Sequence, residues 1–404
     1  MRLVIVPLIL ALLVGCASRP LAPLVPVEGA PPDSMVAATL ERAVTMGEIL
    51  HSYRWAQSMW TENLELIDEL QPTLVGRAAL VWGWEHLMLR SLGALRFRVA
   101  AVHELAPDAV VQGCIFEFVS RDVERVKVPE EVLAAFGQPV EHRAFDFDAM
   151  LPATAEPDWF PGWEREAAVP DITRTETQLW FYHLATLYLD AGIEAIHLGN
   201  LERMAAHDPG LRRTEVLLRR IREYAAANAR RGWVMLDAHT HGVVLDGRLL
   251  LDFHSFPLRP REVGDPARED VVLEAGFLDA IYGRSRGGVT PSGTHVESQR
   301  YLVELDNGYA GPSAGGCELP ECVWGCDEIT WFWRQSPDRR DELLAYFWHR
   351  VQELDPVGRL QVPGVRTLQA QLSRGCERYL MHDPGAVGCG AGQVSAVLEL
   401  WSGR

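Results

Sequence analysis

Carboxylate and imidazole side chains recur near the carboxyl ends of apolar segments in this sequence. Asp237 and His239 end the densest of these segments, residues 233–239, and His241 follows two residues later. The same pattern in other segments gives Glu117, His197, Asp252, His254, Glu304 and Asp306. A buried carboxylate is costly unless it is paired or used. Several segments that each deliver one therefore predict a functional site.

These residue types favour acid–base chemistry between carboxylates. We expect Glu304 or Asp306 to act as nucleophile or base, and Glu117 or Asp237 to act as the acid. The other members would bind substrate hydroxyl groups: His197, His239, His241, Asp252 and His254. A packing role stays open for some of them. Glu117 alternates with two phenylalanines and can face either way, and His197 can be a hydrogen-bonded core histidine.

The segments that position these residues alternate between strand and helix patterns. Near-continuous apolar strands are expected over 76–85, 109–120, 192–199, 233–239, 249–256, 300–307 and 329–333. Helical patterns are expected over 36–70, 85–105, 175–191, 211–230, 270–282 and 339–353. The prediction is an α/β fold, a (β/α)8 TIM-like barrel with N-terminal helices and loop insertions, in which the strand ends meet at one face. An open doubly wound sheet is the alternative, although no G-x-G-x-x-G motif follows a strand.

The sequence predicts a single folded domain over residues 37–404. Residues 138–172 hold several prolines and aromatic residues without a clear period, which indicates an insertion. A second irregular region, residues 311–328, contains three of the cysteines.

The N-terminus begins MRLVIVPLILALLVGC, a short positive start followed by an apolar run too short to span a bilayer. The final LLVGC closely resembles the lipobox of bacterial lipoproteins. The resemblance implies a signal peptide over residues 1–15, lipid on Cys16 and attachment to the cell envelope, with the outer membrane favoured. A Pro-rich tether is expected over residues 16–36. An ordinary signal peptide with a chance cysteine is the alternative.

Composition limits the partners and the redox state. The formal net charge of −17 argues against nucleic acid as a partner. Six cysteines remain after Cys16, and an even number in an exported chain favours disulfides. We expect a Cys376–Cys389 bridge and another within residues 317–326, with zinc in CELPECVWGC as the alternative. The sequence leaves the oligomeric state open.

Two further resemblances bear on function. The segment MLDAHTHG resembles the metal-binding strand of amidohydrolases, which implies zinc on His239 and His241 with a third ligand such as His197 or His254. The pattern of strand-end carboxylates is similar to that of TIM-barrel glycoside hydrolases, and thirteen tryptophans suit a sugar substrate. Residues 170–200 also look like uncharacterised exported barrel proteins. The leading hypothesis is an exported glycan hydrolase without a cofactor, and the alternatives are a zinc hydrolase or a non-catalytic carbohydrate-binding lipoprotein.

Overall fold

The computed structural model describes most of the chain after residue 24. The described residues are 25–160, 165–240, 242–263, 270–273, 285–307, 327–369, 373, 375–382 and 389–403. The predicted signal peptide, the lipidated Cys16, His241 and the cysteines of residues 317–326 lie outside them.

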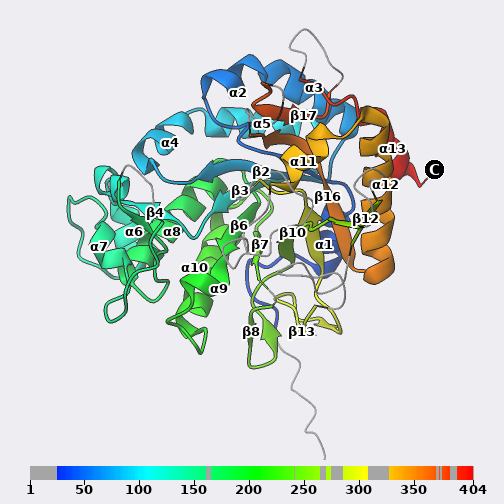
Figure 1. The fold of residues 1–404 in the computed structure, drawn as a ribbon. Helices are drawn as coiled ribbons and strands as arrows, with labels where there is room; N and C mark the ends of the chain where they lie inside the picture. Colours follow the sequence, from blue (N-terminus) through cyan, green and yellow to red (C-terminus); the bar gives the residue numbers. More distant parts are fainter. Residues whose placement is uncertain are drawn as a thin grey trace, which may run out of the picture.

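Eight parallel strands form a nearly closed barrel (Figure 1). Each strand except β7 pairs with the next one in the series, and the last pairs with the first. In order they are β1 (Ala43–Met46), β2 (Leu74–Val81), β3 (Val110–Ile115), β6 (Ala195–Asn200), β7 (Met235–His239), β10 (His254–Pro257), β15 (Tyr301–Glu304) and β16 (Gly358–Thr367). The predicted (β/α)8 barrel is confirmed, and the doubly wound alternative is wrong, because β7 and β10, the two ends of the paired series, lie against each other rather than at opposite edges of an open sheet.

The barrel has one seam, between β7 and β10. Here regular pairing is replaced by a backbone hydrogen bond from Asp252 N to Leu236 O, at 2.9 Å. Arg222 reaches into this seam and donates to Val234 O at 2.9 Å and to Asp252 Oδ2 at 2.9 Å. Asp252 Oδ2 also accepts from Leu236 N at 2.7 Å, so this ion pair replaces the missing ladder bonds.

Helices cover the outer surface of the barrel (Figure 1). The longer ones are α3 (Trp60–Leu70), α5 (Leu95–Leu105), α8 (Thr175–Asp190), α10 (Arg212–Asn228), α12 (Pro337–Leu354) and α13 (Val394–Ser402). The start of α12 follows from its sequence, because Ser336 caps the helix at Arg339 N and Pro337 occupies the first turn. Among the described helices, none has the length and apolarity needed to cross a bilayer.

An apolar layer fills the barrel where the strands begin. Its members are Ala43, Leu74, Val110, Ala195, Met235, Phe253 and Leu302, one from each of seven strands or their leading residues. Helix α1 (Asp33–Leu40) packs Val36 and Leu40 against this layer. The amino-terminal end of the barrel is therefore closed by hydrophobic packing.

Several sequence expectations about the elements are wrong. Residues 36–70 are not all helical, because the four-residue strand β1 lies among them and is too short to show a period. Residues 329–333 belong to the helix α11 (Glu328–Arg334), whose apolar run is buried on every side and so imitates a strand. β16 was not anticipated. Residues 270–272 form the strand β12 (Asp270–Val272), paired with β11 (Arg261–Val263), in place of the expected start of a helix.

The expected tether is shorter than predicted. Val27 N donates to Pro291 O at 2.8 Å, and Gly29 O accepts from Val234 N at 3.0 Å. From Val27 onward the chain is therefore part of the folded body, since these backbone bonds fix it against the barrel.

The irregular region over residues 138–172 contains two short elements. They are α7 (Phe147–Met150) and the strand β5 (Ala167–Ala168), which pairs with β4 (Val119–Ser120). The predicted Cys376–Cys389 disulfide is confirmed.

Candidate active site

Above the apolar layer, the barrel interior becomes polar. The residues two positions further along the strands are Thr45, Gln112, His197, Asp237, Ser255 and Glu304. Because alternate strand residues face the same side, these side chains also point into the barrel. They are joined by Gln361 of β16 through its hydrogen bond to Thr45. We call these seven residues the polar layer; it lies toward the carboxyl ends of the strands, where barrel enzymes hold their active sites.

Glu304 is the ionised carboxylate of the polar layer. Its Oε2 accepts from Thr45 Oγ1 at 2.9 Å, and its Oε1 is ion-paired with Arg77. Gln361 Nε2 supports Thr45 at 2.8 Å and occupies space that only Gly76 leaves open, since a Cβ there would lie 2.2 Å from that nitrogen. Burial alone would raise the pKa of Glu304, but Arg77 and Arg366 outweigh it and lower the pKa below its ordinary value.

Asp237 is fully buried and accepts hydrogen bonds from three side chains. Its Oδ1 accepts from Gln112 Nε2 at 2.8 Å. Its Oδ2 accepts from Ser255 Oγ at 2.5 Å and from His197 Nδ1 at 2.7 Å. Burial raises the pKa of Asp237 to about 7, although Ser255, Arg77 and Gln112 act in the opposite direction. The polar layer thus holds two carboxylates whose environments drive their pKa values apart.

Arg77 and two histidines connect these carboxylates. Arg77 donates to His239 Nε2 at 3.0 Å while it pairs with Glu304. The rings of His239 and His197 meet edge to face, with centroids 4.7 Å apart. Burial, followed by the positive charge of Arg77 and the other imidazole, holds the pKa of His239 well below its ordinary value, and burial and Arg77 do the same for the pKa of His197. Both rings are therefore neutral, and a continuous chain of contacts runs from Glu304 to Asp237.

Asp306 lies next to this chain of contacts. Arg366 of β16 is ion-paired with Asp306, donates to Asn307 Oδ1 at 2.8 Å, and lies 3.9 Å from Glu304 Oε2. The structure therefore brings Asp306 to the same end of the barrel as Glu304, with a guanidinium between the two carboxylates.

Three other predicted site residues have different surroundings. Glu117 Oε2 accepts from Asn200 N at 2.7 Å, beneath Gly199, whose φ of +51° suits glycine and whose absent Cβ would lie 2.0 Å from that oxygen. Asp252 pairs with Arg222 in the β7–β10 seam. His254 lies beside Ser255, which faces inward, so its own side chain faces the outer helices and lies 6.0 Å from the ring of Phe256.

Sequence reasoning missed several members of the site. Thr45, Gln112, Ser255 and Gln361 are uncharged and gave no signal by residue type. Arg77 and Arg366 have the type that usually lies at the surface, and Arg77 adopts a left-handed φ of +56°. The signal that identifies Thr45, Gln112 and Ser255 is their position, because each lies two residues after an apolar residue that faces into the barrel.

Aromatic side chains adjoin the polar layer at the ends of β2 and β3. The ring of Phe116 lies 5.7 Å from that of His197, and 5.8 Å from Arg77 Cζ. Trp82 packs edge-on against Phe116 at 5.2 Å, and Trp84 follows it at 41% exposure. Apolar ring surface thus continues outward from the buried charges.

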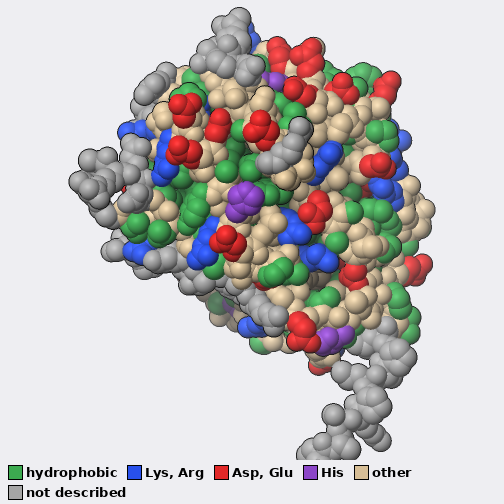
Figure 2. Space-filling model, turned by 90° about the vertical axis from the view of Figure 1, so that its right-hand side faces the viewer, with side chains coloured by type: hydrophobic (Ala, Val, Ile, Leu, Met, Phe, Trp, Pro, Cys, Tyr) green, Lys and Arg blue, Asp and Glu red, His purple; other side chains and the backbone are tan. Residues whose placement is uncertain are grey.

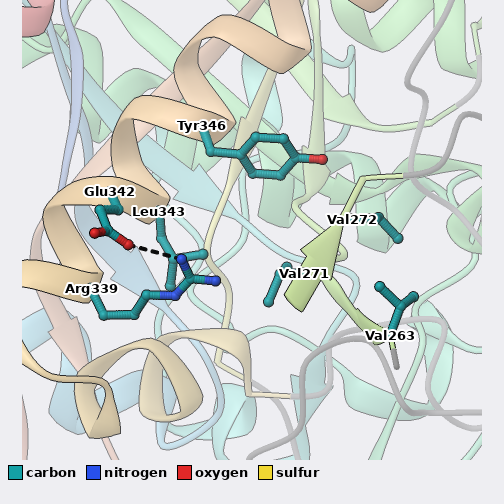
Figure 3. Close-up of a pocket in the computed structure, with 7 residues that line it drawn as sticks. All are labelled: Val263, Val271, Val272, Arg339, Glu342, Leu343 and Tyr346. Carbon is teal, nitrogen blue, oxygen red and sulfur yellow. Dashed lines mark hydrogen bonds and ion pairs between the residues drawn. The ribbon is translucent and has the colours of Figure 1, made fainter. Parts of the chain in front are cut away.

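A separate cavity of about 470 Å³ lies on the outside of the barrel, between β11–β12 and α12 (Figure 3). It is lined by Val263, Val271, Val272, Arg339, Glu342, Leu343 and Tyr346, none of which belongs to the polar layer. On the face shown in Figure 2, described Lys and Arg side chains stand among Asp and Glu, with acidic groups frequent in its upper part.

The zinc alternative needs His239 together with His241, and His241 lies outside the described residues. No group of three or more His, Cys, Asp or Glu among them is placed to hold a metal ion. The Nε2 of His239 accepts from Arg77, so a metal at this nitrogen would have to displace a buried guanidinium.

Comparisons with known proteins establish neither a family nor an activity. No family model and no curated protein matches the sequence. A noncanonic maltogenic alpha-amylase from Thermotoga neapolitana aligns with TM-score 0.34 and 11% identity over 54% of this chain and 50% of its own. A xylosidase from Aspergillus niger aligns with TM-score 0.26 and 14% identity (43% and 22%), and a GH31 family sulfoquinovosidase from E. rectale with 0.30 and 11% (52% and 32%). The chain spans half or less of each of these proteins.

Proposed function

We propose that this protein is a hydrolase of glycans that works by acid–base chemistry in the polar layer. The observation that carries the proposal is the pair formed by Glu304 and Asp237. Both are buried inside the barrel, yet the pKa of Glu304 is lowered and that of Asp237 is raised to about 7. When the pKa values of two carboxylates in one site are shifted in opposite directions, one stays ionised and the other can hold a proton. Here Glu304 would be the ionised group and Asp237 the group that holds the proton.

The roles follow from the charges. Glycoside hydrolysis develops positive charge on the sugar ring in the transition state. Glu304, kept ionised by Arg77 and Arg366, would stabilise that charge. Asp237 and the histidine bonded to it would supply and recover the proton that the leaving oxygen needs.

A sugar substrate is supported by the surroundings of the site. His239 is partly exposed at the end of β7, and the ring of Phe116, which packs against Trp82, lies beside His197. Sugar rings pack their C–H faces on aromatic side chains and use their hydroxyl groups for hydrogen bonds. The arrangement provides both kinds of contact.

The test is a hydrolysis screen of the full-length chain purified in detergent. Polysaccharides, peptidoglycan fragments and aryl glycosides are incubated with protein, and new reducing ends are measured. We expect turnover that is unchanged after dialysis against a chelator. Loss of activity with the chelator supports the zinc hydrolase instead, and glycan binding without any cleavage supports a carbohydrate-binding protein.

We propose further that the protein needs no cofactor and is held at the bacterial cell envelope, at the outer membrane, by lipid on Cys16. Support comes from the lipobox-like LLVGC. Cys16→Ala is expected to release the protein into the soluble fraction and to remove the acyl mass from the N-terminal peptide. A variant that stays in the membrane fraction would show that lipid on Cys16 is not the anchor.

A further inference from the structure

The carboxylate of Asp237 already accepts hydrogen bonds from three neighbouring side chains. Its Oδ1 is occupied by Gln112, and its Oδ2 by Ser255 and His197. Of these three partners only His197 titrates, so it is the partner through which the Asp237 carboxylate can move a proton.

His197 presents a second nitrogen for that purpose. Its Nδ1 lies 2.7 Å from Asp237 Oδ2 and donates to that oxygen when the carboxylate is ionised. Its Nε2 is buried and has no hydrogen-bond partner among the described residues. A buried polar atom without a partner is destabilising, and such atoms persist where a function uses them.

We propose that Nε2 of His197 is the atom that exchanges the proton with the substrate, and that Asp237 is a positioning residue that acts through it. The inference rests on the proposed function. In the reaction, the pair starts with two protons, one shared between Asp237 and Nδ1 and one on Nε2. The Nε2 proton passes to the leaving glycosidic oxygen as its bond to the sugar carbon breaks. A water oxygen forms the new bond to that carbon, and the proton released by the water returns to Nε2, which restores the pair.

The charges around His197 fit this exchange. Asp237 and His239 face it from β7, Arg77 from β2, Glu304 from β15 and Asp306 from just after β15. Glu304 and Asp306 favour a proton on the ring, whereas burial and Arg77 oppose it. The ring is therefore neutral at rest. Its Nε2 carries a proton only when the Asp237–His197 pair holds two protons.

The His197→Asn variant distinguishes the role of Nδ1 from that of Nε2. The asparagine amide can take the place of Nδ1 and donate to Asp237, which keeps the buried carboxylate paired, but it offers nothing in place of Nε2. We expect kcat to fall at least 100-fold with KM within a few-fold of wild type, and free imidazole to restore part of the turnover. His142→Asn, at an exposed histidine, is the control and keeps full activity. A His197→Asn chain within tenfold of wild-type kcat would overturn the proposal.

A second measurement determines which nitrogen of His197 is protonated, and it needs no substrate. Histidine ¹⁵N spectra, with His197 assigned by its loss in His197→Asn, report which ring nitrogen carries the proton. We expect Nδ1–H in the wild type, and a shift of the proton to Nε2 in Asp237→Asn, whose amide competes as a donor. A wild-type neutral ring protonated on Nε2 overturns the pairing. If the wild type cleaves no glycan, the proposed function and the catalytic part of this inference both fail, and the spectra still decide the pairing.

Discussion

The two ends of the barrel each bury a carboxylate among cations, and they differ in what lies next to it. Glu194, directly before β6, is fully buried and pairs with Arg230 at 2.8 Å, Arg231 at 2.7 Å and His103 at 3.3 Å. These partners come from α5 and from the segment after α10, outside the barrel. Glu304 at the other end pairs with Arg77 and Arg366, which both come from barrel strands.

Both carboxylates have a lowered pKa, so a buried ion pair alone does not mark a functional site. Burial alone would raise the pKa of Glu194, and His103 with Arg230 lowers it. What distinguishes the Glu304 end is the second carboxylate with a raised pKa and the unpartnered nitrogen of His197. The Glu194 cluster lies at the amino-terminal end of the barrel strands, where residues usually contribute to stability. The polar layer lies toward the carboxyl end, where barrel enzymes hold their active sites.

The largest expected effect separates these two glutamates by activity. Glu304→Gln removes the negative charge opposite the developing positive charge, and we expect kcat/KM to fall by about 10²-fold or more. Glu194→Gln is the matched control, with turnover per folded molecule unchanged. Both are measured on folded protein well below the melting temperature. Equal losses in the two variants would remove the functional distinction between the two ends.

The next effect concerns stability in the β7–β10 seam. Arg222→Met leaves Asp252 buried without its cation, and breaking a buried pair costs about 3–5 kcal/mol of unfolding free energy. Arg219→Met, on the exposed side of the same helix, is the control, and we expect a change below about 0.5 kcal/mol. Urea unfolding measures both. A small effect at Arg222 would show that the seam does not depend on this pair.

The sequence predicted the barrel because its strands are apolar runs separated by amphipathic helices. It missed β1 and misassigned residues 329–333, since four residues show no period and a fully buried helix shows none either. Those errors concern local signals, while the strand order depends on the whole set of alternating segments.

The candidate site was predictable only for charged residues that lie at strand ends. Glu304, Asp237, His197 and His239 meet as expected, because strands carry their inward residues to one interior. Asp252 and His254 share the same sequence pattern but lie in the seam and on the outer face. The direction in which a strand side chain points depends on the register of its neighbours, which one sequence does not contain.

The smallest effect distinguishes the two ends by the sign of their pH dependence. Asp237 has a raised pKa, so its contribution to stability is present below about pH 4 and is lost as the pH rises through about 7. Glu194 has a lowered pKa, so its contribution is present above its ordinary value and is lost as the pH falls through the lowered one. We therefore expect Glu194→Gln to cost about 1–3 kcal/mol at pH 7 and progressively less in acid. Asp237→Asn should instead flatten the decline in stability between about pH 4 and 7. Urea unfolding at a series of pH values gives both slopes, and slopes of the same sign in the two variants would mean that the two carboxylates do not differ in the way their surroundings indicate.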